Sequence, residues 1–162
     1  MYKFNEMDQI TEKIFLGDYS ASVDVPLLKQ HGIKKVLTVS DYLGGPKYDI
    51  NEFSHKRINI YDISGINIIQ YFGECLRFME GNEKILVHCM AGASRSATIV
   101  IAYLMWSQKL KFSDALNYVQ KKRPLVCPND GFKKQLKIFE NLLTNFNYDI
   151  DFINFKDIIW YY

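Results

Sequence analysis

The sequence is poor in cysteine and proline, and it lacks long apolar runs. Only 3 of its 162 residues are Cys and 4 are Pro. An odd number of cysteines in no paired spacing argues against a disulfide-stabilised scaffold and favours a reducing compartment. No apolar stretch approaches the roughly 20 residues that a membrane-spanning helix needs. We therefore expect no transmembrane segment.

An excess of charge of one sign is also missing. The 20 Lys and Arg residues nearly balance the 18 Asp and Glu residues, which leaves a formal net charge of +2. The sequence shows no basic stripe of the kind that binds nucleic acid. Its densest basic groups are residues 121–123 (Lys-Lys-Arg) and the trio Lys133, Lys134 and Lys137. We expect both groups to be solvated helix faces, with at most a mild attraction for phosphorylated partners.

The first ten residues carry no recognisable targeting signal. The sequence MYKFNEMDQI lacks the apolar core of a signal peptide, and Tyr2 stands where N-myristoylation requires a glycine. We therefore expect a cytoplasmic protein, with the nucleus as the alternative, that binds neither nucleic acid nor membranes.

A chain of this length is expected to form one domain with a substantial core. We assign residues 1–146 to that domain. Residues 147–162 form a tail that is rich in Ile, Phe, Trp and Tyr. For this tail we expect packing on the domain, a docking role, or continuation into a longer native chain.

Short apolar segments alternate with segments of helical periodicity. Ile69, Phe72, Leu76 and Met79, for example, recur at helical spacing. We expect strands over residues 9–10, 13–17, 34–40, 57–60 and 85–87. We expect helices over residues 19–22, 24–31, 67–80, 96–104, 112–122 and 130–145, and a surface loop or hairpin over residues 41–56. The alternation predicts an α/β fold with a central, mainly parallel or mixed sheet of about five strands and helices on both of its faces.

The segment 83–104, EKILVHCMAGASRSATIVIAYL, combines a buried strand, a tight loop of small residues and a buried helix. Such a loop can direct backbone N–H groups and the positive end of a helix at one point, which is how proteins hold a phosphate dianion. We therefore expect the phosphate-binding residues to be Met90, Ala91, Gly92, Ala93, Ser94 and Arg95.

Three side chains of this segment add chemistry. Cys89 follows the strand, and the field of the loop amides and the helix start favours its thiolate form, which is the nucleophilic one. Arg95 can return across the loop and grip two phosphoryl oxygens with its planar fork. Ser96 offers a hydroxyl group to the sulfur. The segment thus predicts a cysteine nucleophile beneath a phosphorus atom.

Residues 88–96, HCMAGASRS, resemble the HC-x5-R-[ST] signature of the protein tyrosine phosphatase superfamily, and HCxAGxSRS is the form seen in dual-specificity phosphatases. The segments ATIVIAYLMW and PNDGFKKQL and the surroundings of Asp62 are also similar, so the resemblance covers most of residues 7–145. It implies a protein tyrosine phosphatase-like fold and catalysis through a phosphocysteine without cofactor or metal. It also implies that His88 is a buried partner that supports the cysteine loop.

The oxygen that leaves phosphorus needs a proton from a second loop. Asp62 ends a predicted strand, precedes the flexible pair Ser64-Gly65, and resembles the general acid of the family in its position. Asp41 and Asp49 are competing candidates, although an Asp in a loop is more often a turn former. In the resulting two-step scheme Asp62 protonates the leaving oxygen and then activates the water that hydrolyses the phosphocysteine.

The resemblance also bears on the substrate. The chain is far shorter than the classical tyrosine-specific phosphatases and lacks the loop that deepens their cleft, which implies activity on phosphotyrosine and on phosphoserine or phosphothreonine of proteins. The alternatives are a phosphoinositide phosphatase, an RNA 5′-triphosphatase, or a catalytically silent phosphopeptide-binding module. Loop positions Met90, Ala91 and Ala93 carry none of the lysines typical of phosphoinositide phosphatases. We expect a monomer or a weak dimer.

Two further cysteines lie outside the loop. Cys75 falls on the apolar side of the helix expected over residues 67–80 and is expected in the core. Cys127 belongs to a segment that borders the active site in the family that this chain resembles. We expect Cys127 either to be buried or to trap an oxidised Cys89 as a disulfide.

Overall fold

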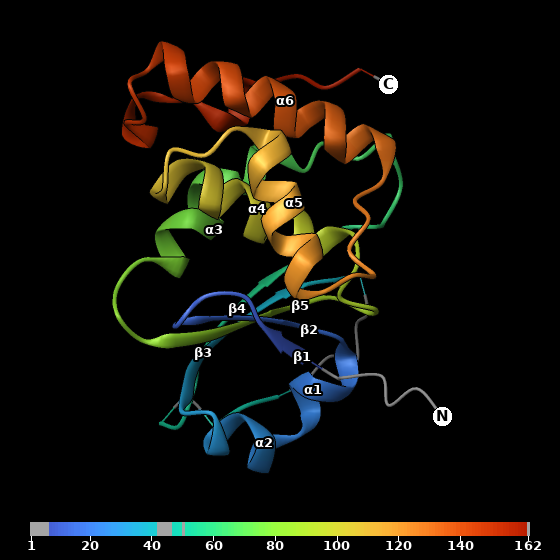
Figure 1. The fold of residues 1–162 in the computed structure, drawn as a ribbon, viewed down its shortest axis with the longest axis vertical. Helices are drawn as coiled ribbons and strands as arrows, with labels where there is room; N and C mark the ends of the chain where they lie inside the picture. Colours follow the sequence, from blue (N-terminus) through green and yellow to red (C-terminus); the bar gives the residue numbers. More distant parts are fainter. Residues whose placement is uncertain (1–6, 42–46, 50, 162) are drawn as a thin grey trace.

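A mixed five-stranded sheet forms the centre of the computed structural model, which describes residues 7–41, 47–49 and 51–161 (Figure 1). In this described part the strands are β1 (Met7–Gln9), β2 (Ile14–Gly17), β3 (Ile33–Val39), β4 (Ser54–Ile58) and β5 (Lys84–His88). Their order across the sheet is β1-β2-β5-β3-β4. The pair β1–β2 is antiparallel and the other pairs are parallel. The predicted mainly parallel sheet is therefore confirmed.

Helices cover both faces of this sheet, as predicted. Figure 1 shows α1 (Tyr19–Val23) and α2 (Val25–Gln30) on one side. On the other side lie α3 (Phe72–Met79), α4 (Arg95–Ser107), α5 (Phe112–Lys122) and α6 (Asp130–Asn145). The larger apolar core lies between the sheet and this second group, and a smaller core lies beneath the first. No helix of the described residues is long and apolar enough to cross a membrane.

Strand β5 is the central strand of the sheet and has a parallel neighbour on each edge. Leu86 is opposite Phe15 of β2 and Val36 of β3. Ile85, Leu86 and Val87 are fully buried, as expected for a central strand covered on both faces. The residues that follow β5 therefore start from a fixed position at the carboxyl edge of the sheet.

The boundaries that the sequence predicted poorly lie at the sheet edges. β4 spans Ser54–Ile58 rather than residues 57–60. The last residues of the loop expected over 41–56 therefore belong to this strand, and part of that loop lies outside the described residues. Only Ile58 of this edge strand is buried, and its remaining residues are polar. Apolar alternation is therefore too weak to mark the strand. The helix expected over 67–80 begins instead as a 3₁₀ turn at Ile69–Tyr71 that continues into α3.

The tail after α6 turns back along the helical layer (Figure 1). It contains two 3₁₀ turns, Ile150–Phe152 and Phe155–Asp157. Ile150, Ile153 and Phe155 are buried against the main core. Phe155 occupies a notch at Gly73, where an added Cβ atom would come within 2.7 Å of its ring. Apolar burial therefore fixes the described part of the tail on α3 and α6.

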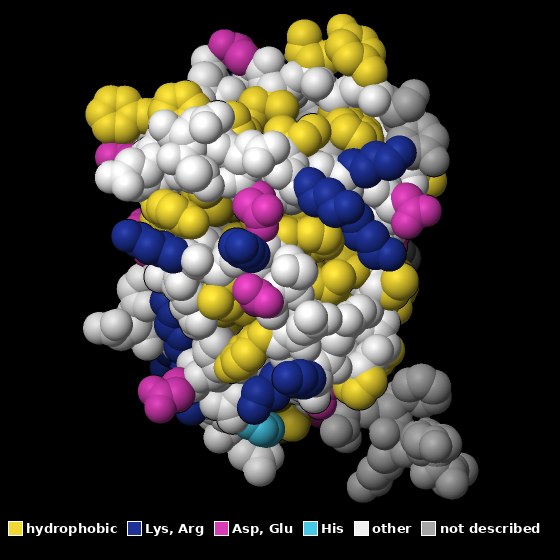
Figure 2. All heavy atoms as spheres, turned by 45° about the horizontal axis from the view of Figure 1, so that its top comes forward, with side chains coloured by type: hydrophobic (Ala, Val, Ile, Leu, Met, Phe, Trp, Pro, Cys, Tyr) yellow, Lys and Arg dark blue, Asp and Glu magenta, His cyan; other side chains and the backbone are white. Residues whose placement is uncertain are grey.

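Figure 2 shows basic and acidic side chains interspersed among apolar ones on the face it presents, in keeping with the small net charge. Lys121, Lys122, Lys134 and Lys137 are exposed. Arg123 is an exception, because it is only 1% exposed. The expectation of a solvated basic face is therefore wrong for this residue.

Candidate active site

The cysteine loop, residues 89–94, connects the end of β5 to the first residue of α4. Gly92 has a φ of +65°, and an added Cβ atom would lie 2.4 Å from the carbonyl oxygen of Gly17. A side chain at this position would therefore be strained and would collide with the backbone at the end of β2. Gly92 thus allows the loop to fold back over the edge of the sheet.

Five consecutive carbonyl groups of this region accept hydrogen bonds from donors outside the loop. The acceptor oxygens, with their donors, are Cys89 O with His88 Nδ1 at 3.2 Å, Met90 O with Tyr19 N at 3.1 Å, Ala91 O with Arg123 Nη2 at 3.1 Å, Gly92 O with Arg123 Nε at 3.0 Å, and Ala93 O with Cys127 N at 2.8 Å. Each peptide group is planar, so fixing its carbonyl also fixes its N–H. This arrangement leaves the N–H side of the loop for the centre of the site.

Arg123 is the main contributor to this arrangement. It ends α5, binds two loop carbonyls, and its Nη1 donates to Asp8 Oδ2 of β1 at 2.7 Å. A buried guanidinium is stable only when paired, and Asp8 supplies the opposite charge. Sequence reasoning missed this residue because an arginine at a helix end next to two lysines gives no signal of burial.

Cys89 lies beneath the loop and is 2% exposed. Its Sγ accepts hydrogen bonds from the Gly92 N–H at 3.2 Å and from the Ser96 hydroxyl at 3.0 Å. Ser96 is fully buried in the first turn of α4. Two donors that converge on one sulfur stabilise negative charge there. The structure therefore places Ser96 where the sequence predicted it.

Arg95 is buried at the start of α4, with 7% of its surface exposed. Its Nη1 donates to Asp41 Oδ1 and to the Ile60 carbonyl oxygen, the latter at 3.1 Å. Its Nε is a buried donor that makes no hydrogen bond within the described residues. Such a donor is costly unless a ligand satisfies it. An oxyanion bound at the loop would supply that acceptor.

Asp41 therefore binds and orients Arg95. This role differs from that of the proton donor, for which the sequence made Asp41 a candidate. The hydrogen bond from Arg95 lowers the pKa of Asp41 below its ordinary value of 3.8. A lowered pKa makes a carboxyl group a poorer proton donor than an ordinary one. Asp49 is exposed, and its Oδ1 accepts from the Asn51 backbone N–H at 2.9 Å, as in a local turn.

Asp62 lies over the loop on its other side. Its Oδ1 accepts hydrogen bonds from Ser94 Oγ at 2.7 Å and from Asn129 Nδ2 at 2.9 Å. Its Oδ2 lies 4.0 Å from Arg95 Nε, and its side chain is 36% exposed. One carboxylate oxygen is thus anchored and the other faces the centre of the site, which is the geometry of a proton donor.

Ser94 and Asn129 both hold the Asp62 side chain in position. The sequence did not indicate this role for either residue. The Ser94 hydroxyl donates to Asp62 and accepts the Asn129 N–H at 3.1 Å. Asn129 also caps α6, because its Oδ1 accepts from Phe132 N at 2.9 Å. An Asn directly before a helix is a recognisable capping signal in a sequence. The hydrogen bond from its Nδ2 to Asp62 leaves no such signal.

His88 is buried behind the loop. Its Nε2 lies 2.7 Å from the Thr38 hydroxyl, which also contacts His55 Nε2 at 2.8 Å. Burial lowers the pKa of His88 to about 4. The ring is therefore neutral at pH 7 and acts through the Cys89 carbonyl, in a place that suits the expected supporting role.

The other two cysteines differ in exposure. Cys75 is fully buried on α3, and burial raises the pKa of its thiol. Cys127 is exposed rather than buried, next to the loop through its bond to Ala93, and its Sγ lies 4.0 Å from Lys133 Nζ. A disulfide between Cys127 and Cys89 stays a prediction.

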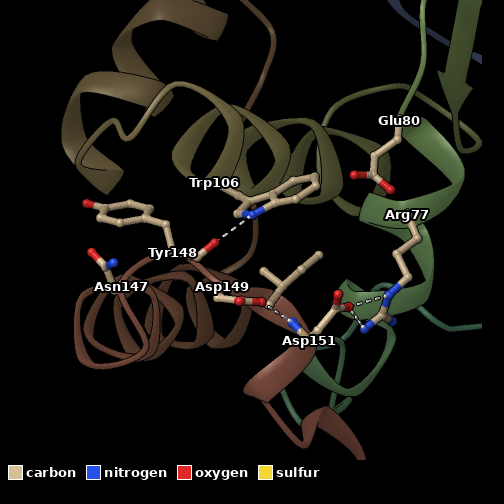
Figure 3. Close-up of a pocket in the computed structure, with 8 residues that line it drawn as sticks. Arg77, Glu80, Trp106, Asn147, Tyr148, Asp149 and Asp151 are labelled. Carbon is tan, nitrogen blue, oxygen red and sulfur yellow. Dashed lines mark hydrogen bonds and ion pairs between the residues drawn. The ribbon is translucent and has the colours of Figure 1, made fainter.

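A surface pocket of about 370 Å³ lies elsewhere, between α3, the end of α4 and the start of the tail (Figure 3). It is lined by Arg77, Glu80, Trp106 and residues 147–151. Arg77 Nη2 and Asp151 Oδ1 form an exposed ion pair at 2.9 Å. No cluster of metal-ligating side chains occurs among the described residues.

Comparisons with known proteins agree with this assignment. Residues 14–142 match the family model described as dual specificity phosphatase, catalytic domain. The chain is similar to mouse dual specificity protein phosphatase 19, with 40% identity over 131 residues, which cover 78% of this chain and 59% of that protein. It therefore spans less than two thirds of that relative.

Solved structures give the same result. The crystal structure of human tyrosine phosphatase-like serine/threonine/tyrosine-interacting protein superposes with a TM-score of 0.81 and 34% identity, over 85% of this chain and 97% of that one. A mouse putative dual specificity phosphatase complexed with zinc tungstate gives a TM-score of 0.83 at 26% identity, over 88% and 91% of the two chains.

The role of Asp41 predicts a change in anion affinity. We expect Asp41→Asn to weaken the binding of inorganic phosphate roughly tenfold, because Arg95 loses a charge-assisted hydrogen bond that orients it. Isothermal titration calorimetry measures this affinity, and Asp41→Glu should restore part of it. Asp49→Asn is the matched control. An unchanged affinity in Asp41→Asn would show that Arg95 is held without Asp41.

The buried neutral His88 predicts a loss of stability in acid. The pKa of His88 is about 4 in the folded protein and ordinarily 6.5, so the unfolded chain binds the proton more readily between these values. The stabilising contribution of the neutral ring is complete above pH 6.5 and is lost as the pH falls toward 4. Urea unfolding of wild type and His88→Gln at pH 7 and pH 4.5 tests this. The stability difference between the two proteins should shrink at the lower pH, and a constant difference would contradict the assignment.

Proposed function

The chain belongs to the dual-specificity phosphatases, and from this premise we propose that it hydrolyses phosphotyrosine and phosphoserine or phosphothreonine in proteins through a phosphocysteine intermediate. One observation carries the proposal. Cys89 Sγ accepts two hydrogen bonds beside Arg95, whose Nε has no hydrogen-bond acceptor among the described residues. The cysteine nucleophile therefore lies beside the donor that would bind the phosphoryl group.

In the first step the Cys89 thiolate attacks phosphorus and the bond from phosphorus to the substrate oxygen breaks. The loop amides and Arg95 hold the three equatorial oxygens, so they stabilise the charge that develops there. These groups supply the electrostatic stabilisation, and the scheme draws on no cofactor or metal.

Asp62 supports this step as the proton donor. Ser94 and Asn129 hold its Oδ1, so a proton on Oδ2 faces the leaving oxygen. When the phosphorus–oxygen bond breaks, that proton passes to the leaving oxygen and the product alcohol or phenol is neutral.

In the second step water attacks the phosphocysteine. Asp62, now a carboxylate, takes a proton from the water while the sulfur–phosphorus bond breaks. The sulfur leaves as a thiolate, which the Ser96 hydroxyl stabilises at 3.0 Å. Inorganic phosphate is released and the resting state is restored.

A protein substrate fits the apolar surroundings of the site. Met90 is 46% exposed in the loop, and Tyr61 and Ile63 beside Asp62 are 61% and 57% exposed. These apolar groups can contact a peptide around its phosphorylated residue, whereas the loop side chains Met90, Ala91 and Ala93 offer no cation to further phosphates. This supports protein substrates over a phosphoinositide or an RNA 5′-triphosphate.

The proposal also covers the cellular location and the oligomeric state of the protein. The three cysteines are free thiols in the structure, which supports a reducing compartment. We place the protein in the cytoplasm, with the nucleus as the alternative, as a signalling enzyme that acts as a monomer or weak dimer.

A substrate panel tests the proposed function. We expect wild type to hydrolyse phosphotyrosine and phosphothreonine peptides in the presence of a chelator, with vanadate as an inhibitor, and to leave phosphoinositide and RNA 5′-triphosphate intact. Cys89→Ser should abolish turnover because serine is a far weaker nucleophile, while phosphopeptide binding persists. Phosphate release and fluorescence anisotropy measure the two properties. Turnover by Cys89→Ser, or peptide binding without turnover in wild type, would refute the proposal.

The proton donor predicts a dependence on the leaving group. We expect Asp62→Asn to lower kcat/KM for a phosphothreonine peptide by roughly 10²–10⁴ and to have a much smaller effect for p-nitrophenyl phosphate. The nitrophenolate needs no proton to leave, whereas the alkoxide does. Steady-state kinetics with both substrates measure the ratio. Equal losses for the two substrates would remove Asp62 from this role.

A further inference from the structure

We propose that the tail residue Trp160 positions the catalytic acid by holding the loop that carries Asp62. The proposal rests on the proposed function and assigns part of it to a segment beyond residues 14–142. Trp160 touches no reacting atom, so it is a positioning residue.

The tail contacts the Asp62 loop at two points. The indole N–H of Trp160 donates to the Ser64 carbonyl oxygen at 3.0 Å, across 96 positions of sequence. The Asn67 side-chain amide donates to the Ile158 carbonyl oxygen at 2.7 Å. These two bonds attach residues 64–67 to the tail just after the catalytic acid.

Helix α6 holds the same loop from another side. Gln135 is fully buried, accepts the Ile69 N–H at 3.0 Å, and donates to the Ile66 carbonyl at 2.8 Å. The backbone of Ser64 packs so closely on Gly131 that an added Cβ atom there would lie 2.0 Å from the Ser64 oxygen. The loop therefore lies against both α6 and the tail.

The start of this loop has little apolar burial of its own. Tyr61 and Ile63 are largely exposed, and the Asp62 side chain is 36% exposed. A segment held mainly by hydrogen bonds opens more easily than one held by buried apolar contacts. The loss of a single bond to Ser64 therefore changes the fraction of time that Asp62 points at the leaving oxygen.

The tail provides a firm anchor for this contact. Ile153 and Phe155 are each 6% exposed, and the Phe155 ring fills the notch at Gly73. Trp160 follows this buried anchor by five residues and is itself half-buried. A functional group supported from a rigid element is held more precisely than one on a free loop.

Trp160→Phe tests the proposal because it keeps the aromatic ring and removes the N–H donor. We expect kcat/KM for a phosphothreonine peptide to fall about three- to tenfold, the range of one neutral hydrogen bond, and kcat/KM for p-nitrophenyl phosphate to stay within a factor of two. Because kcat/KM reports phosphoryl transfer to Cys89 and not the later hydrolysis, the comparison isolates the proton donation.

Trp106→Phe is the matched control. The Trp106 indole N–H donates to the Tyr148 carbonyl oxygen at 3.0 Å, a bond of the same kind at the other end of the tail (Figure 3). We expect this variant to lower the melting temperature without changing the ratio of the two kcat/KM values. If both tryptophan variants change the ratio equally, the tail acts only through overall stability and the proposal is wrong.

The Asp62→Asn background shows whether Trp160 acts through Asp62. We expect Trp160→Phe to have no further effect there, because the group it positions is gone. An equal loss in both backgrounds would overturn the proposal. Asn67→Leu, which removes the second contact, should reproduce the leaving-group effect and gives the same test if Trp160→Phe folds poorly. Lack of activity in wild type would refute the proposed function, whereas an active wild type with an unchanged ratio in both Trp160→Phe and Asn67→Leu would refute only this inference.

Discussion

The orientation of the peptide groups between Cys89 and Arg95 is the constraint on which the rest of the structure depends. The side chains of residues 90–93 carry no cation, so the loop has to bind an anion through its backbone N–H groups together with Arg95. Those groups point inward because donors outside the loop bind the carbonyls of residues 89–93. Strand β1, helix α1, the end of α5 and the residues before α6 all contribute to this arrangement.

The charges around the loop follow from the same constraint. Arg95 is buried with one side paired to Asp41 and with Nε left for an anion. Arg123 is buried behind the loop and paired to Asp8. Each of these buried guanidinium groups has a carboxylate that offsets the cost of its burial. The site is therefore electrostatically balanced before substrate arrives.

Much of this could be predicted from the sequence, and the limits have physical reasons. The strand, loop and helix around Cys89 were predictable because small residues, a terminal cysteine and two apolar runs are local signals. Ser96 and Asp62 were predictable from spacing and resemblance. The pairing of Asp41 with Arg95, the contacts that bury Arg123 and the contact from Trp160 to Ser64 join residues 31 to 115 positions apart. No local pattern records such contacts, because they depend on how whole elements pack.

Two backbone segments pack closely beside the site, where the Asp62 loop meets α6. Ser64 lies against Gly131 with no room for a methyl group between them. The first turn of α6 thus limits sterically how close the segment that follows Asp62 can come to the helix. This contact blocks any displacement of that segment toward α6. The position of the proton donor therefore depends on steric clearance at residue 131, where the missing Cβ atom of glycine leaves room for the Ser64 backbone.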